Sequence, residues 1–143
     1  MPLLFLNSLH MINKAYDRVR KSIQHQFDLM GAEVDVLMFL ANHPEHNTAQ
    51  EIVDLRKLTK SHASLAIKQL ESKGYITRST NPENRKENHI QLTSKSQPVT
   101  RYGQQLQQAF IDQLFQGFSS KQKQAFVQAL NQIEENLLER TSS

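Results

Sequence analysis

The chain has 143 residues, the length of one domain, and its composition of 38% hydrophobic and 22% charged residues predicts a folded, helix-rich protein and excludes a disordered one. It contains no cysteine, which excludes a disulfide framework, thiolate catalysis and cysteine-ligated zinc. The first residues lack the features of a signal peptide, and no run approaches the roughly 20 apolar residues that cross a bilayer. We therefore expect a cytoplasmic protein without membrane contact.

The positive charge is concentrated in the middle of the chain. Residues 48–95 carry nine Lys and Arg against five Asp and Glu, whereas residues 1–47 carry four against five and residues 96–143 carry four against four. A local basic surface indicates a polyanionic partner such as nucleic acid. An excess of this size is also common on ordinary solvated surfaces, so charge alone does not decide between the two.

A long first helix is predicted over residues 5–28, because apolar residues recur there at steps of three and four. Gly31 ends it, and a second helix follows over residues 32–41. Thr48 and Glu51 have the spacing of a capping box, which predicts the start of a third helix. The apolar stripe of the first helix consists of Phe5, Leu9, Ile12, Tyr16, Val19, Ile23 and Phe27.

The third and fourth predicted helices form a helix-turn-helix. The third is short, Thr59 can cap the fourth, and Gly74 supplies the left-handed stop of the fourth. Two strand-like segments, residues 75–78 and 89–93, then predict a hairpin whose long polar tip is residues 79–88. The inward positions of the fourth helix are Ala63, Ala66, Ile67 and Leu70.

The carboxyl-terminal part returns to helix. One helix is predicted from about residue 98 to 116, and a second capping box, Ser119 with Gln122, begins the last helix. The stripe of the last helix, like that of the first, is longer than a small domain can cover, so we expect two copies of the chain to pair through these stripes. The alternative is that the two terminal helices pack on each other within one chain. The stripe of the last helix is Phe126, Leu130, Ile133 and Leu137.

These elements predict a fold that is mainly α with a small β-hairpin wing. Residues 31–97 are predicted to form a winged helix-turn-helix lobe that binds DNA. Residues 1–30 and 98–143 are predicted to form long N- and C-terminal dimerisation helices. The whole is expected to be one continuous chain fold.

The amino end of the fourth predicted helix is polar, which fits a helix that enters DNA. The second helix of a helix-turn-helix lies in the major groove with its first residues at the base edges, and the helix dipole there favours phosphate. Leu65 shares a face with Ser61 and Lys68, where it either meets a thymine methyl group or lies under the wing. Ser61 and His62 can contact phosphates instead of bases. The predicted contacts on this helix are Lys60, Ser61, His62, Ser64, Leu65 and Lys68.

A second group of DNA contacts is predicted in the hairpin. Arg85 and Lys86 lie in its tip, where an arginine can enter the minor groove or hold phosphates. Glu83 and Glu87 partly offset their charge, so a merely solvated loop is the alternative. Arg78, at the end of the first strand-like segment, completes the predicted contacts.

The segment from Glu51 to Arg78 resembles, without a gap, the winged helix-turn-helix of the MarR-type (multiple antibiotic resistance regulator) transcription factors. The strongest part is LESKGYITR at residues 70–78, and NRK at residues 84–86 followed by IQLT is similar to the family's wing. The resemblance implies a homodimer that reads a pseudo-palindromic operator, usually as a repressor relieved by a small ligand. Asn84 replaces the family's usual wing aspartate and Leu65 a common arginine, so operator preference is expected to differ.

The same resemblance implies an effector pocket between the dimer helices and the DNA-binding lobe. His10, Tyr16, Phe27 and Phe39 are its candidate lining, although apolar residues at helical spacing also fit a plain core. A phenolic or other amphipathic acid is the candidate effector, and a regulator without any ligand is the alternative. No cofactor is expected.

An enzyme and a protein-interaction module are the competing classes. No glycine-rich phosphate loop, nucleophile elbow or HExxH pattern occurs, so no catalytic residue is predicted. His43 and His46 could approach one metal ion, but no carboxylate or thiol completes a ligand set by spacing, so no metal site is predicted. The other alternative is a winged helix that binds only protein. A DNA-binding assay distinguishes it from a DNA-binding regulator.

Overall fold

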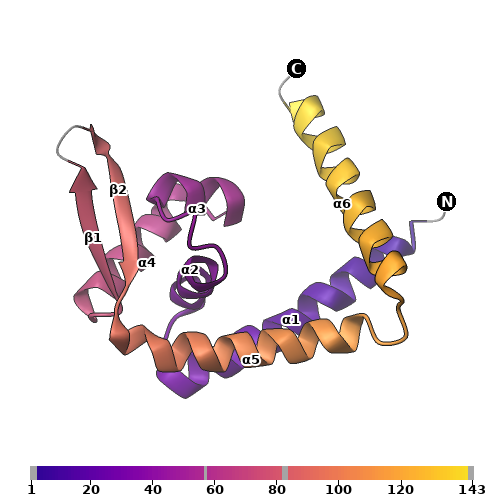
Figure 1. Ribbon diagram of the computed structural model, residues 1–143, viewed down its shortest axis with the longest axis horizontal. Coiled ribbons are helices and arrows are strands. Elements are labelled where there is room, and N and C mark those ends of the chain that lie inside the picture. Colours follow the sequence, from indigo (N-terminus) through magenta and orange to yellow (C-terminus); the bar gives the residue numbers. More distant parts are fainter. Residues whose placement is uncertain (1–2, 57, 82–83, 142–143) are drawn as a thin grey trace. The chain divides into compact units, whose positions relative to one another are not determined.

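The computed structural model describes residues 3–56, 58–81 and 84–141, with their side chains except at positions 80, 81, 84–88, 140 and 141. It confirms a mainly α fold with one hairpin (Figure 1). The chain divides into two compact units, Met1–Gln108 and Ala109–Ser143. None of the described helices is both long and apolar enough to cross a bilayer. The elements are α1 (Phe5–Phe27), α2 (Gly31–Asn42), α3 (Ala49–Arg56), α4 (Lys60–Ser72), β1 (Ile76–Asn81), β2 (Asn84–Leu92), the short 3₁₀ helix η1 (Ser94–Ser96), α5 (Gln97–Leu114) and α6 (Ser120–Thr141).

Helix α1 is buried only toward its carboxyl end. It stops at Asp28, which has a φ of 52°, so the helix ends before the predicted stop at Gly31. Aspartate is one of the few residues that adopt this left-handed conformation at small cost. Ile23 is the fully buried residue of α1. The exposed large apolar side chains in and just before α1 are Leu3, Leu4, Phe5, Leu6, Leu9 and Met11.

Helix α2 lies at the centre of the first unit. Residues 33–40 are all buried, including the charged Glu33 and Asp35. Helices α1, α3 and α4 and strand β2 all contact α2, which explains why it is covered on every side.

Helices α3 and α4 form the predicted helix-turn-helix, joined by residues 57–59. The N–H of Glu51 donates to Oγ1 of Thr48 at 3.2 Å, and the N–H of His62 donates to Oγ1 of Thr59 at 3.1 Å, which confirms both predicted starts. Gly74 has a φ of 83° and follows α4 as the predicted left-handed stop. The four predicted inward residues of α4 are all buried: Ala63, Ala66, Ile67 and Leu70.

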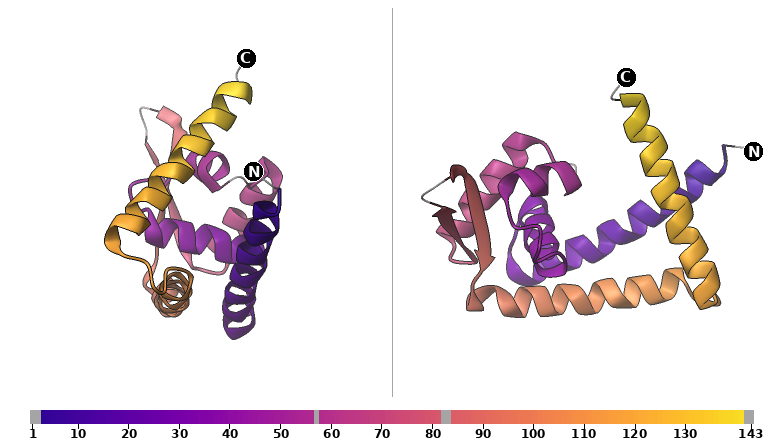
Figure 2. Two further views of the ribbon diagram at one scale, coloured as in Figure 1. Left: turned by 90° about the vertical axis from the view of Figure 1, so that its right-hand side faces the viewer. Right: turned by 45° about the horizontal axis from the view of Figure 1, so that its top comes forward.

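The hairpin has longer strands than predicted. Strands β1 and β2 pair from Ile76 opposite Leu92 to Asn81 opposite Asn84, so they occupy most of the expected loop 79–88. An antiparallel ladder satisfies the backbone whatever the side chains are, and a polar sequence therefore continues the ribbon into solvent. The two strands run side by side next to α4 (Figures 1 and 2).

The base of this wing is fastened to the segment before α3. The N–H of Ile90 donates to the carbonyl oxygen of Asn47 at 2.7 Å, and Nδ1 of His89 lies 2.8 Å from Oδ1 of Asn47. Thr48 also forms a β-bridge with His89. The wing and the start of α3 are therefore held together as one structure.

The second unit contains the end of α5 and all of α6. The N–H of Ser119 donates to Oε1 of Gln122 at 2.9 Å and the N–H of Gln122 donates to Oγ of Ser119 at 3.1 Å, which confirms the second predicted capping box. Phe115 packs edge-on against Phe118 and Phe126. No residue of α6 with a described side chain is buried. Its exposed large apolar residues are Phe126, Val127, Leu130, Ile133, Leu137 and Leu138.

Candidate nucleic-acid interface

The predicted contact residues of α4 form a single exposed surface. Ala63, Ile67 and Leu70 occupy the opposite side of the helix and pack into the protein. Helical geometry separates the two sets, because residues three and four apart share a face. The structure thus brings six residues together in solvent: Lys60, Ser61, His62, Ser64, Leu65 and Lys68.

Leu65 lies on the side of α4 that faces α1 and α2. It is 53% exposed and lines a groove of about 360 Å³ with His62, Gln24 and Met30. The described residues of the wing do not line this groove. Contact between Leu65 and a thymine methyl group stays a prediction.

Lys60 and Ser64 line a second, smaller groove between α3, α4 and β1, together with Gln50 and Arg78. The side chain of Arg78 is 32% exposed, and its Nε lies 3.5 Å from Oε1 of Glu71. A phosphate bound here would therefore share Arg78 with that carboxylate. Gln50 was not predicted as a contact. Its position between Thr48 and Glu51 of the capping box, in the first turn of α3, was the signal that could have identified it.

The side chains of Arg85 and Lys86, the predicted contacts at the tip of the wing, are not among those that the structure describes. Arg85 and Lys86 belong to the backbone of β2, whereas a loop was expected. Strand β2 begins at Asn84, which pairs with Asn81 of β1. Arg85 and Lys86 are therefore the second and third residues of β2. Their contact with DNA stays a prediction.

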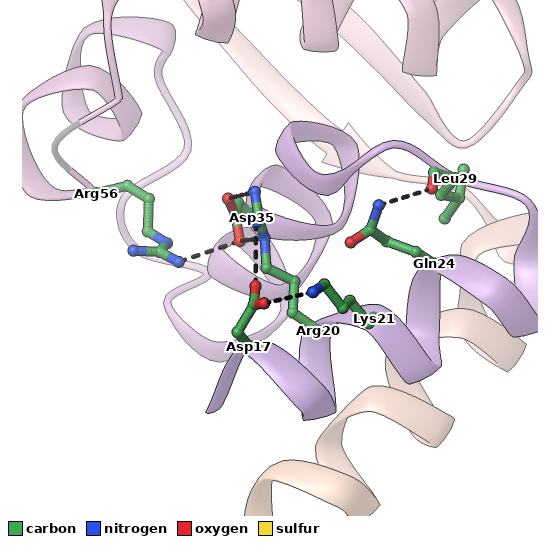
Figure 3. Close-up of polar contacts among 7 residues, drawn as sticks. All are labelled: Asp17, Arg20, Lys21, Gln24, Leu29, Asp35 and Arg56. Carbon is green, nitrogen blue, oxygen red and sulfur yellow. Dashed lines mark hydrogen bonds and ion pairs between the residues drawn. The ribbon is translucent and has the colours of Figure 1, made fainter. Parts of the chain in front are cut away.

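A buried carboxylate joins three helices of the first unit (Figure 3). Asp35 of α2 accepts hydrogen bonds from Nε of Arg20 at 3.0 Å and from Nη2 of Arg20 at 2.9 Å, one on each oxygen. Arg56, the last residue of α3, donates from Nη2 to Oδ1 of Asp35 at 3.1 Å. A buried carboxylate is destabilising unless it is paired and hydrogen-bonded, and the two guanidinium groups provide both.

A second buried carboxylate connects α2 to the carboxyl end of α4. Glu33 is fully buried, and Nζ of Lys73 donates to its two oxygens at 2.8 and 3.1 Å. The N–H of Met30 donates to Oε1 of Glu33 at 2.9 Å. Asp35 and Glu33 therefore hold the helix-turn-helix to α2 at its turn, through Arg56, and at its carboxyl end, through Lys73.

The start of α3 carries a third polar cluster. Nδ1 of His46 donates to Oε2 of Glu51 at 2.5 Å, and the hydroxyl of Thr48 donates to Oε1 of Glu51 at 2.9 Å. The bond from His46, followed by that from Thr48, holds the pKa of Glu51 below its usual value because both bonds favour the charged carboxylate. In the part of the chain that the structure describes, histidines and carboxylates do not form a set able to hold a metal ion.

Two of the four predicted effector residues meet in one groove. Tyr16 and Phe39 line a groove of about 330 Å³ among α1, α2, α5 and the end of α3. Nε2 of Gln107 donates to the hydroxyl of Tyr16 at 2.7 Å. Phe27 packs against the hydrophobic core instead, and His10 is exposed on α1 outside this lining. The other lining residues are Asn13, Asp35, Met38, Asn42, His43, Arg56 and Gln107.

The sequence model of the MarR family matches residues 31–87, which run from the start of α2 into β2. This segment is a MarR family domain. It contains the helix-turn-helix, its caps and the exposed surface of α4, so the resemblance found in the sequence is confirmed. No curated protein matches this chain significantly.

Solved MarR structures share the fold over nearly the whole chain. A MarR family transcriptional regulator from Listeria monocytogenes, complexed with 26mer DNA, is 22% identical with a TM-score of 0.80, covering 94% of this chain and 89% of that chain. MepR of S. aureus, in a complex with DNA, is 18% identical with a TM-score of 0.74, covering 90% and 93%. MarR of Staphylococcus aureus, in complex with salicylate and kanamycin, is 27% identical with a TM-score of 0.70, covering 94% and 91%. The winged helix-turn-helix fold is thereby confirmed.

Proposed function

We propose that this protein is a transcriptional regulator that binds double-stranded DNA with the amino end of α4, which we call the recognition helix. The observation that carries the proposal is the exposed polar turn at Lys60, Ser61 and His62, placed where the helix dipole favours phosphate. The DNA complexes of the Listeria regulator and of MepR support the same use of the shared fold. A cytoplasmic location is part of this proposal, because a regulator of genes acts where the DNA is.

The proposed active form is a homodimer built from the terminal helices. Large apolar side chains stay exposed along the start of α1 and along α6, including Phe5, Ile133 and Leu137. Apolar stripes of this length are an aggregation liability in a monomer, and a second copy with the same stripes covers them. The residues assigned to this role are 1–30 and 98–143, with 31–97 as the DNA-binding lobe.

A two-fold dimer requires an operator with matching symmetry. Each copy presents one recognition helix, so the two half-sites lie about one helical turn apart, roughly 10 base pairs, on one face of the duplex. Lys60 and Lys68 of α4, with Arg78 and Arg85 of the wing, provide the cations for phosphate contacts. Binding therefore weakens steeply as salt rises.

A small amphipathic or phenolic acid is the proposed effector, and repression relieved by that ligand is the proposed mode of action. The groove beside Tyr16 and Phe39 has a volume at the lower end of ligand pockets, which span about 300–1,000 Å³. Arg56 lines the groove and also ends α3, so an occupant contacts a residue next to the recognition helix. The salicylate complex of the S. aureus MarR supports this class of ligand.

The test is selection of DNA fragments from the organism's own genome by the purified protein, followed by sequencing. We expect enrichment of short pseudo-palindromic sites, and release of those sites when salicylate is added as a probe. Failure to enrich any duplex at low salt contradicts DNA binding and favours a protein-interaction module. Enrichment that salicylate does not change contradicts only this choice of effector.

A further inference from the structure

We propose that Asp35 is a positioning residue for DNA binding. By holding Arg56 at the end of α3 and Arg20 of α1 together, it fixes the direction of the first turn of the recognition helix. This inference rests on the proposed DNA-binding function. Asp35 does not lie on the DNA-binding surface, but it affects the orientation of the residues that do.

The first turn of the recognition helix has no apolar anchor of its own. Lys60, Ser61 and His62 are all exposed, and the first buried side chain is the small Ala63. The larger buried side chains lie further along the helix and hold its middle and its end. The direction of the first turn therefore depends on the segment that precedes it.

Two side chains anchor that segment: Arg56 through its bond to Asp35, and Leu58, which packs against the hydrophobic core. Of the eight residues of α3, all of them described, Ile52 alone is fully buried. Arg56 is the last residue of α3, and its hydrogen bond of 3.1 Å to Asp35 joins this end of the helix to α2. Leu58 and Thr59 directly precede α4. A shift of Arg56 is consequently passed to the first turn of the recognition helix.

Asp35 can hold Arg56 in place because Arg20 fixes the carboxylate. The planar fork of Arg20 donates to both oxygens, at 3.0 and 2.9 Å, and such a bidentate pair sets orientation as well as charge (Figure 3). Asp35 is 6% exposed, so water cannot readily replace either guanidinium. Gly31 leaves the space for Arg20, since a Cβ at position 31 would lie 2.4 Å from its Nη2.

Glu33 provides a matched comparison within the same helix. It is also a buried carboxylate of α2 with a cationic partner, but that partner, Lys73, caps the far end of α4. A general loss of packing would make the Asp35 and Glu33 variants behave alike. A positioning role for Asp35 changes only the first turn of the recognition helix and the DNA affinity that depends on it.

The experiment compares Asp35→Asn with Glu33→Gln in the full chain. The first readout is hydrogen exchange of the His62 and Ala63 amides without DNA, because both donate to Thr59. The second is the affinity of the folded protein for a selected duplex. Asp35→Asn is expected to speed exchange at these amides and to weaken DNA binding roughly 2- to 30-fold. Glu33→Gln is expected to leave both readouts at the wild-type level.

Further variants separate positioning from a loss of stability. Gly31→Ala keeps every charge but displaces the fork of Arg20, and it is expected to reproduce the effect of Asp35→Asn. Arg56→Lys is expected to retain affinity, because Arg56 uses a single N–H on Asp35. Adding Arg56→Met to Asp35→Asn is expected to cause no further loss, since the two residues act as one contact.

Two results have distinct meanings. If Asp35→Asn and Glu33→Gln change both readouts equally, Asp35 is a structural residue only and the inference is overturned. If wild-type protein binds no duplex, the proposed function fails, while exchange at His62 and Ala63 still shows whether Asp35 orients the first turn. Gly31→Ala supplies both readouts if the Asp35 variant does not fold.

Discussion

The backbone N–H of His62 donates to Oγ1 of Thr59 at 3.1 Å, and this bond fixes the residue at which the recognition helix begins. Thr59 has an extended backbone with a φ of −68° and a ψ of 151°, so the chain turns into the helix at this residue. The cap at Thr59 therefore has two roles. It satisfies an otherwise unpaired donor, and it aligns the turn that carries Lys60 and Ser61.

Thr59→Ala is predicted to lower the free energy of unfolding by about 0.5–2 kcal/mol, because the N–H of His62 loses its partner. Urea denaturation followed by circular dichroism measures the change. Thr59→Ser keeps the hydroxyl and is the matched control, expected to stay close to wild type. An equal loss in both variants would show that the hydroxyl is not the cause.

Lys60→Ala is predicted to weaken binding of all duplexes alike and to reduce the slope of log affinity against log salt by about one. The reason is that a lysine at the first position of α4 meets phosphate, which carries no sequence information. Fluorescence anisotropy at several salt concentrations on a panel of operator variants measures both quantities. An unchanged slope contradicts a phosphate contact.

Leu65→Ala is predicted to change which operator variants are preferred while leaving the salt slope alone. Its exposed side chain has no charge to release counterions, but it can contact a thymine methyl group in the major groove. The same operator panel measures the preference, with substitutions of thymine by uracil as the most specific probe. A uniform loss across all variants would argue against a base contact by Leu65.

Ile133→Asp on α6 is predicted to convert the dimer to a monomer, because a carboxylate would have to be buried in an apolar interface. Ile133 is 52% exposed in the single chain, so the change does little to the fold of one copy. Light scattering after size exclusion measures the mass. Gln128→Asp on the same helix is the control that keeps the dimer. A dimer in both variants contradicts the role assigned to this stripe.

The pH dependence of stability is predicted to depend partly on Glu51. Its pKa in the folded protein is lowered, chiefly by the hydrogen bond from His46, so the charged carboxylate stabilises the fold above the unfolded value near 4.5. This contribution is lost as the pH falls through the folded pKa. Glu51→Gln should therefore lose less stability than wild type between pH 5 and pH 3, in urea titrations at each pH. Parallel losses would contradict the assignment.

The elements with local signals were predictable from the sequence. Thr59, Ser119 and Gly74 mark helix ends through bonds or backbone angles that involve residues at most four positions away. Ala63, Ile67 and Leu70 repeat at helical spacing, so their burial follows from the pattern alone. For the same reason the polar first turn of α4 was assigned correctly to the exposed surface.

The remainder depends on partners distant in sequence. Asp35 can be buried because Arg20 and Arg56, which lie 15 and 21 residues away in the sequence, pair with it. No local sequence pattern predicts these two ion pairs. Phe27 and Tyr16 belong to one predicted stripe, yet α1 turns Tyr16 to a groove and Phe27 to the core. The long polar ribbon was missed because its strands lack the apolar alternation on which strand prediction depends.

The central claim is that two copies of the recognition helix bind one duplex through contacts with phosphates and bases. A salt titration of wild-type protein with a genome-selected duplex, combined with sedimentation of the complex, tests it most directly. Two chains per duplex are expected, with an affinity that falls linearly on logarithmic axes at a slope of about −0.9 for each phosphate neutralised. A single chain per duplex, or an affinity that does not respond to salt, would contradict it.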